Sequence, residues 1–105
     1  MDIQLKKGLL DICVLTVLKR GDSYGYQIVK DVSGYVETSE STLYPILKRL
    51  EANGSLTTYS VEHQGRLRKY YQITGNGKEK IQEFLVEWKQ VEKIYQFIKE
   101  ENERE

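Results

Sequence analysis

The spacing of apolar residues changes twice along this chain, and these changes restrict its fold more than any other feature of the sequence. Within residues 3–19, 24–32 and 40–52, apolar side chains recur every three or four positions, as on one face of an α-helix. Residues 55–74 instead alternate around a central glycine, which predicts a β-hairpin. Helical spacing returns over residues 77–100. The predicted fold is therefore mainly α with one β-hairpin, in the order helix, helix, helix, hairpin, helix.

Three helices followed by a hairpin are typical of the winged helix-turn-helix. In that fold the third helix enters the major groove of DNA and the hairpin forms a wing. The distribution of charge favours this interpretation. The whole chain has a formal net charge of zero, but residues 41–80 contain seven Lys and Arg against three Asp and Glu. Binding to phosphates requires a local basic surface, not a basic chain.

The predicted DNA contacts lie mainly on the third helix and the hairpin. Apolar residues at i, i+3, i+4 and i+7 from Leu43 to Leu50 are expected to face the core, which directs the polar side chains outward or to the flanks. Residues 64–69 are expected to form a flexible basic loop that lies along the DNA backbone or in the minor groove. The predicted DNA-binding residues are Tyr24, Ser41, Thr42, Tyr44, Pro45, Lys48, Arg49, Arg66, Arg68, Lys69 and Tyr70.

Each of these features also has a simpler explanation. An exposed Lys-Arg pair or a basic hairpin tip, taken alone, is more often solvated surface. Their joint placement on two elements that a winged helix brings to one face favours double-stranded DNA as the partner. A protein-interaction adaptor that uses the same fold without DNA is the alternative, and it predicts no salt-dependent DNA binding.

The final helix carries an apolar seam with heptad spacing. Its members follow each other at alternating intervals of three and four over two and a half heptads. A helix about 35 Å long would exceed the small body on which it could pack, so a monomer would expose an apolar patch. We therefore expect a homodimer whose interface is completed by the first helix, residues 3–19. The predicted interface residues are Ile81, Phe84, Leu85, Trp88, Val91, Tyr95 and Ile98.

The remaining reactive side chains do not indicate an enzyme. The only histidine, His63, lies near the hairpin tip without a nucleophile nearby, and the chain has no metal-ligand spacing, P-loop or dinucleotide fingerprint. The single cysteine, Cys13, lies in an apolar run and is expected to be a buried thiol. Without a signal peptide or a long uncharged apolar stretch, the chain is expected to be cytoplasmic, with no membrane contact, cofactor or metal.

Three segments resemble the PadR family of phenolic acid decarboxylase regulators, and together they span essentially the whole chain. Residues 18–26 (LKRGDSYGY) resemble the start of the family's second helix. Residues 41–54 (STLYPILKRLEANG) resemble its recognition helix nearly residue for residue, and residues 65–74 (GRLRKYYQIT) are similar to its wing and final strand. The single short C-terminal helix resembles that of the smaller PadR subfamily.

The resemblance implies a transcriptional repressor that binds a palindromic operator and dimerises through its first and last helices. It also implies division into a winged helix-turn-helix at 1–75 and a dimerisation helix at 76–105. Some relatives release DNA when a planar or phenolic compound binds between protomers, and Trp88 matches the tryptophan that stacks on the ligand in multidrug-responsive relatives. Phe84 stands where such relatives tend to have a smaller residue, and a ring there would fill the pore. The implied effector-binding residues are Leu5, Leu9, Ile12, Phe84 and Trp88.

Overall fold

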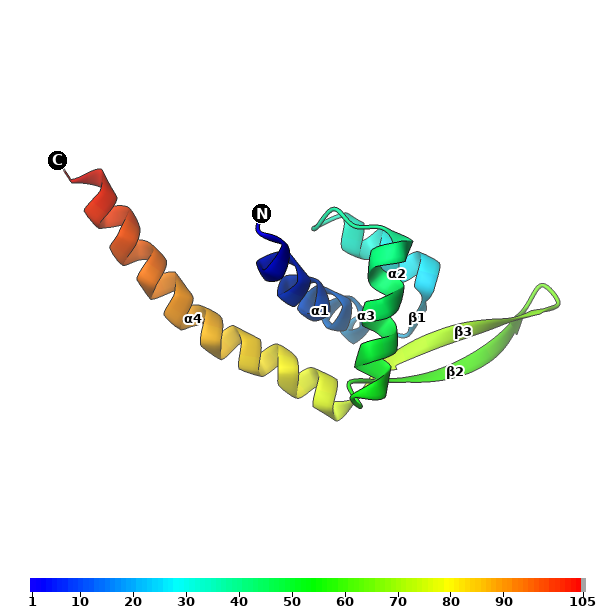
Figure 1. The fold of residues 1–105 in the computed structure, drawn as a ribbon. Coiled ribbons are helices and arrows are strands. Elements are labelled where there is room, and N and C mark those ends of the chain that lie inside the picture. Colours follow the sequence, from blue (N-terminus) through cyan, green and yellow to red (C-terminus); the bar gives the residue numbers. More distant parts are fainter. Residues whose placement is uncertain (105) are drawn as a thin grey trace.

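The computed structural model describes residues 1–104, and it confirms the fold class, with four helices and a small antiparallel sheet among those residues (Figure 1). The helices α1, α2 and α3 form a compact body, and the hairpin and α4 extend from it in different directions (Figure 1). In chain order the elements are α1 (Ile3–Lys19), β1 (Ser23–Tyr24), α2 (Gly25–Ser33), α3 (Glu40–Ala52), β2 (Leu56–His63), β3 (Arg66–Ile73) and α4 (Gly75–Glu103).

The core lies between α1, α2 and α3, and each of these helices contributes apolar side chains to it. Leu15, Ile28 and Leu47, one from each helix, have no exposed surface. Burial of a side chain of this size contributes about 1.5–3 kcal/mol relative to exposure. Tyr71 of β3 and Ile81 of α4 close the core, at 8% and 7% exposed. The body is thus held together by its own contacts.

The hairpin has a shorter turn and more regular pairing than the sequence predicts. Its two strands pair from Leu56 opposite Ile73 to His63 opposite Arg66. The turn consists of Gln64 and Gly65 alone, both with positive φ (52° and 78°), as in the two-residue turns that match the twist of a hairpin. The expectation of a flexible basic loop over residues 64–69 is therefore wrong, because the basic residues from Arg66 onward lie within β3.

The start of α2 also differs from the sequence prediction. Tyr24 is not the first residue of the helix but belongs with Ser23 to β1, which pairs with Tyr71 and Tyr70 of β3. The sheet order is therefore β1-β3-β2. Two residues are too few to show an alternating pattern, so the sequence gives no sign of this third strand.

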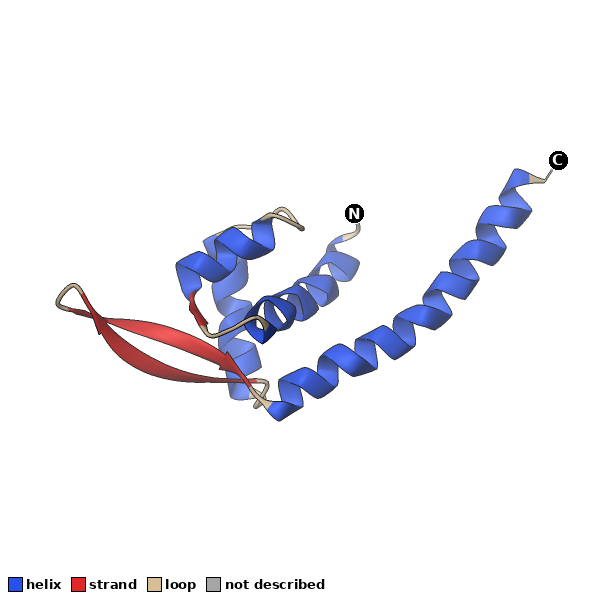
Figure 2. Ribbon diagram, turned by 180° about the vertical axis from the view of Figure 1, so that it is seen from behind, coloured by secondary structure: helices blue, strands red, loops and turns tan. Residues whose placement is uncertain are grey.

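The helix α4 extends as an arm away from the body (Figure 2). It runs from Gly75 to Glu103, somewhat beyond the predicted 77–100, and its N-cap Thr74 accepts a hydrogen bond from the Gly77 amide. Only Gly77 and Ile81 are buried on it, and the molecule measures 66 × 26 × 21 Å as a result. Along residues 1–104, none of the helices combines the length and apolarity needed to cross a membrane.

Candidate nucleic-acid interface

The centre of the exposed face of α3 is formed by Ser41, Pro45 and Lys48. These residues follow each other at i, i+4 and i+7, opposite the buried Leu43 and Leu47. All three are exposed. A hydroxyl, an apolar ring and a cation on one helical stripe can contact phosphate oxygens, thymine methyl groups and base edges.

Tyr44 lies on the flank of this face that adjoins α2. Its ring rests on Gly25, where an added Cβ atom would lie 2.5 Å from Tyr44 Cε1 and 3.0 Å from the Tyr44 hydroxyl oxygen. Burial, followed by the charge of Glu40, raises the pKa of the Tyr44 phenol. The phenol therefore remains a neutral hydrogen-bond donor near neutral pH. The residue is 42% exposed, so part of the tyrosine is open to solvent beside α2.

Arg49 lies on the opposite flank, toward α1. Its guanidinium donates hydrogen bonds of 2.8 Å to both carboxylate oxygens of Asp11, and the pKa of the guanidinium is raised by these bonds. Arg49 also lines a surface hollow together with Thr42 and Lys7. The sequence interpretation places Lys48 and Arg49 outward or on the flanks of the helix, and the structure assigns them to different positions. Lys48 projects from the centre of the exposed face, whereas Arg49 joins α3 to α1.

One face of the wing carries a row of tyrosine rings that holds Arg68. The Arg68 guanidinium carbon lies 4.0 Å from the centroid of the Tyr24 ring. Tyr24 meets Tyr70 edge-on, and Tyr70 stacks on Tyr59, each pair with 5.7 Å between centroids. A cation held over an aromatic face loses freedom but keeps its charge. The row therefore fixes the direction in which Arg68 presents its guanidinium.

The row ends in a hydrogen bond that the sequence interpretation missed. The Tyr59 hydroxyl donates to Asp22 Oδ2 at 2.6 Å, and this bond is the main reason that the pKa of the Tyr59 phenol is raised. Tyr59 stands directly opposite Tyr70 in the hairpin register. The alternation over residues 55–62 places Tyr59 on one face of its strand, but only the register identifies the ring beside it.

The opposite face of the wing is tied to the end of α3. Glu51 accepts hydrogen bonds from Thr58 Oγ1 at 2.9 Å and from Lys69 Nζ at 3.3 Å. These bonds, Thr58 first, lower the pKa of the Glu51 carboxyl. Neighbouring residues of a strand point to opposite faces, so Lys69 lies on the face opposite Arg66 and Arg68. Of the three predicted wing cations, two share a face and the third links the wing to α3.

A groove of about 350 Å³ lies between α1, the end of α3 and the first turns of α4. Of the residues that the resemblance implies for an effector site, Ile12 and Phe84 line this groove, whereas Leu5, Leu9 and Trp88 do not. Trp88 instead stacks on Phe84, with 5.4 Å between ring centroids. One face of the tryptophan is thus covered by its own chain.

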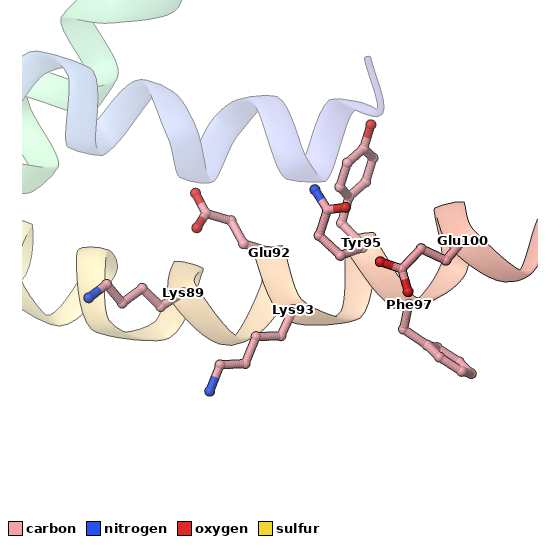
Figure 3. A pocket seen from close by; sticks show the side chains of 7 residues that line it. Lys89, Glu92, Lys93, Tyr95, Phe97 and Glu100 are labelled. Atoms are coloured by element: carbon pink, nitrogen blue, oxygen red, sulfur yellow. The ribbon is translucent and has the colours of Figure 1, made fainter.

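The outer half of α4 exposes apolar side chains. From Lys89 to Arg104 every residue is exposed. Figure 3 shows Glu92 and Tyr95 on the side of α4 toward α1, while Phe97 and Lys93 point away from it. Ile81, which the sequence places in the dimer interface, instead belongs to the protomer's own core. Four other residues of the predicted interface are 41–58% exposed, namely Leu85, Val91, Tyr95 and Ile98. The neighbouring Ile94, which widens the same apolar stripe, is 58% exposed.

The side chains with reactive potential lie apart from one another. Cys13 is half-buried, and burial raises the pKa of its thiol. His63 is exposed at the end of β2. Within residues 1–104, no group of His, Cys, Asp and Glu side chains is arranged to hold a metal ion.

The chain was compared with known protein families and solved structures. The family model described as the transcriptional regulator PadR-like family matches residues 14–83. A transcriptional regulator from Clostridium thermocellum is 33% identical, with a TM-score of 0.80 over 91% of this chain and 95% of that one. A PadR family transcription regulator from hypervirulent Clostridium difficile R20291 is 34% identical, with a TM-score of 0.76 over 85% and 97% of the two chains.

A third structure was solved with its nucleic-acid ligand. Bacillus subtilis PadR in complex with operator DNA is 25% identical to this chain, with a TM-score of 0.69. The similarity covers 74% of this chain and 47% of that protein.

Proposed function

This chain belongs to the PadR-like family of transcriptional regulators, and from that premise we propose that it is a homodimeric repressor that binds a palindromic operator. The family membership makes it a DNA-binding transcriptional regulator and not an enzyme. We propose, beyond this membership, the dimer, the repressor activity and the residues that read the operator.

The observation that carries the proposal is the combination of exposed groups on α3 and the wing. Lys48 and Ser41 lie at the centre of the exposed face of α3. Arg68 is held over Tyr24, immediately before α2. In a winged helix, the third helix enters the major groove while the wing contacts the backbone or the adjacent minor groove. Lys48 and Ser41 would therefore meet base edges and phosphates, and Arg68 would meet the flanking backbone.

The dimer is inferred from the exposed arm. A helix with Val91, Tyr95 and Ile98 at heptad spacing and no cover from its own body is unfavourable in water. A second copy offers the same apolar stripe, so two α4 helices can cover each other around a two-fold axis. Two recognition helices related by that axis read the two halves of a palindrome.

Repression is the mode of regulation that these elements support. The helices α2 and α3 with the wing are assigned to DNA, and α1 with α4 to the partner copy. A dimer that covers two half-sites would exclude other proteins from the same stretch of DNA. We therefore expect transcription from a promoter overlapping the operator to fall when the protein is bound.

The test is a salt-dependent binding measurement on an operator selected from random DNA by the wild-type protein. Specific affinity should fall steeply as salt rises, because each phosphate contact releases a counterion. Lys48→Ala should lower the slope of that dependence by about one unit. Affinity that does not respond to salt would favour the protein-interaction adaptor instead.

A second function, release of the DNA by a small planar aromatic effector, is favoured by the half-buried Trp88–Phe84 stack beside the groove between α1 and α4. Such a compound would stack on the free face of Trp88 in the dimer. Because Trp88 is the sole tryptophan, binding should quench the protein's indole fluorescence and weaken operator binding together. A broad panel of phenolic acids and planar cations that leaves both unchanged would remove this second function.

A further inference from the structure

The base of α4 lies against the main chain of the body at Gly77. A Cβ atom at this position would lie 2.5 Å from the carbonyl oxygen of Ser55 and 2.7 Å from Ile73 Cγ1. Gly75, two residues earlier in the same helix, has nothing within 4 Å of such an atom. Of these two glycines, Gly77 is therefore the one whose missing side chain allows α4 to approach the start of β2 this closely.

Ser55 is the centre of the polar contacts around this approach. It is the only fully buried polar residue of the described chain. Its hydroxyl donates to Asn53 Oδ1 at 2.6 Å and accepts from Lys80 Nζ at 2.5 Å. Its carbonyl oxygen accepts from the Thr74 amide at 3.1 Å. Asn53 is the C-cap of α3, so these bonds connect the base of α4 directly to the end of the recognition helix.

Thr74 makes a second connection between the end of α3 and the base of α4. Thr74 Oγ1 donates to the Gly54 carbonyl oxygen at 2.6 Å and accepts from the Gly77 amide at 3.2 Å. Thr74 therefore caps α4 and holds the turn after α3 at the same time. We call this set of contacts, made by Ser55, Thr74, Gly77 and Lys80, the α4 joint.

The length of α4 amplifies any change at the joint. With a rise of about 1.5 Å per residue, the 29-residue helix is about 40 Å long, and a tilt of about 10° at its base would move its far end by about 7 Å. In a dimer held together by α4, the same tilt would change the separation of the two recognition helices. One base pair step along DNA is only about 3.4 Å, so a tilt of this size would alter the spacing at which both halves fit.

We propose that the α4 joint determines operator spacing, with Gly77, Ser55 and Lys80 as positioning residues that fix the distance between the two recognition helices. None of these side chains needs to touch DNA. Their effect is on which separation of half-sites the dimer accepts, while the sequence read within each half-site stays the same. The inference rests on the proposed homodimer.

The experiment measures affinity for a series of duplexes in which the spacer of the wild-type-selected operator is lengthened or shortened one base pair at a time. Gly77→Ala should move the best spacer or flatten the preference, and should lower affinity for the original spacer by up to about 100-fold, since simultaneous engagement is lost. Its affinity for a single half-site should stay within about twofold of wild type. Gly75→Ala is the matched control and should reproduce the wild-type spacer profile, since it adds the same methyl group in open space.

Thermal melting and sedimentation establish whether each variant is folded and dimeric. If Gly77→Ala is not a folded dimer, the spacer series is measured on Lys80→Met instead. This variant keeps the helix but removes the donor to Ser55, and it should broaden the spacer preference. A folded dimer with the wild-type profile in the deciding variant would overturn the proposal. Wild-type protein that shows no spacer preference, or no dimer, would overturn the proposed function itself, and the joint proposal with it.

Discussion

The helices α3 and α4 carry similar stripes of apolar residues but differ in what covers them. In α3, Leu43 and Leu47 have no exposed surface, whereas in α4 Ile94 and Ile98 are both 58% exposed. The apolar stripe of α3 is covered by the same chain, whereas that of α4 is not. The comparison teaches that helical periodicity identifies an apolar face but not whether the partner of that face is the same chain or another.

The strongest way to break this comparison is to place charge on the uncovered stripe. Tyr95→Glu with Ile98→Glu should abolish the dimer, because four carboxylates would face each other across the axis, and should lower operator affinity by about 100-fold or more. Phe97→Glu is the control, because Phe97 points away from that side of α4 (Figure 3). Sedimentation and gel shifts should find the control dimeric and active. A double variant that remains a dimer would contradict the assignment.

Truncating one apolar side chain in each stripe, Leu47 in α3 and Ile94 in α4, compares the two helices directly. Leu47→Ala should lower the free energy of unfolding by about 2–5 kcal/mol, because the cavity forms in a packed core. Ile94→Ala, made in the Tyr95→Glu, Ile98→Glu background, should change it by less than about 0.5 kcal/mol, because the side chain has no cover in the monomer. Urea unfolding of both variants checks the difference. Equal losses would mean that α4 packs on its own body.

The neighbouring cations of α3 provide a smaller contrast. Lys48→Ala should weaken specific binding by about 1–2 kcal/mol, since Lys48 lies at the centre of the exposed face. Arg49→Ala should act mainly on stability, by about 1 kcal/mol or less, since its guanidinium is paired with Asp11 and remains half-exposed. Affinity and melting temperature are measured on both. A larger loss of affinity in Arg49→Ala would show that Arg49 leaves Asp11 to bind DNA.

The smallest expected effect is the pH dependence of the contact between the wing and α3. The pKa of Glu51 is lowered in the folded protein, so its hydrogen bonds add stability above the ordinary Glu value of about 4.3 and cease to do so as the pH falls through the lowered value. The contribution is below about 1 kcal/mol because the pair is exposed and screened. The stability difference between wild type and Glu51→Gln should be present at pH 7 and vanish toward pH 3. A difference that stays constant over this range would mean that the charge of Glu51 is immaterial.

The sequence predicts the helices well because their order depends on local spacing and end signals. Gly21 and the pair Asn53-Gly54 separate the helical segments, and in α2 and α3 the apolar residues at helical spacing, such as Ile28 and Leu47, are found buried. Where the prediction fails, a partner distant in sequence decides the structure. Ser23 and Tyr24 become a strand only because β3 lies beside them.

The candidate site shows the same division. Helical spacing alone brings Ser41, Pro45 and Lys48 onto one stripe. By contrast, Arg49 is drawn to one flank by a carboxylate 38 positions away, and Tyr59 is joined to Asp22 across the sheet. Pairs of this kind depend on tertiary contacts that no local pattern contains.

In the proposed dimer, a second copy of the chain covers the exposed stripe of α4. Sedimentation equilibrium of the wild-type protein at micromolar concentration measures whether this second copy is present. We expect a species of twice the 12.3 kDa chain mass at concentrations where the protein also binds a palindromic duplex. A well-folded single chain under those conditions would show that α4 remains uncovered and that the protein is not a dimer.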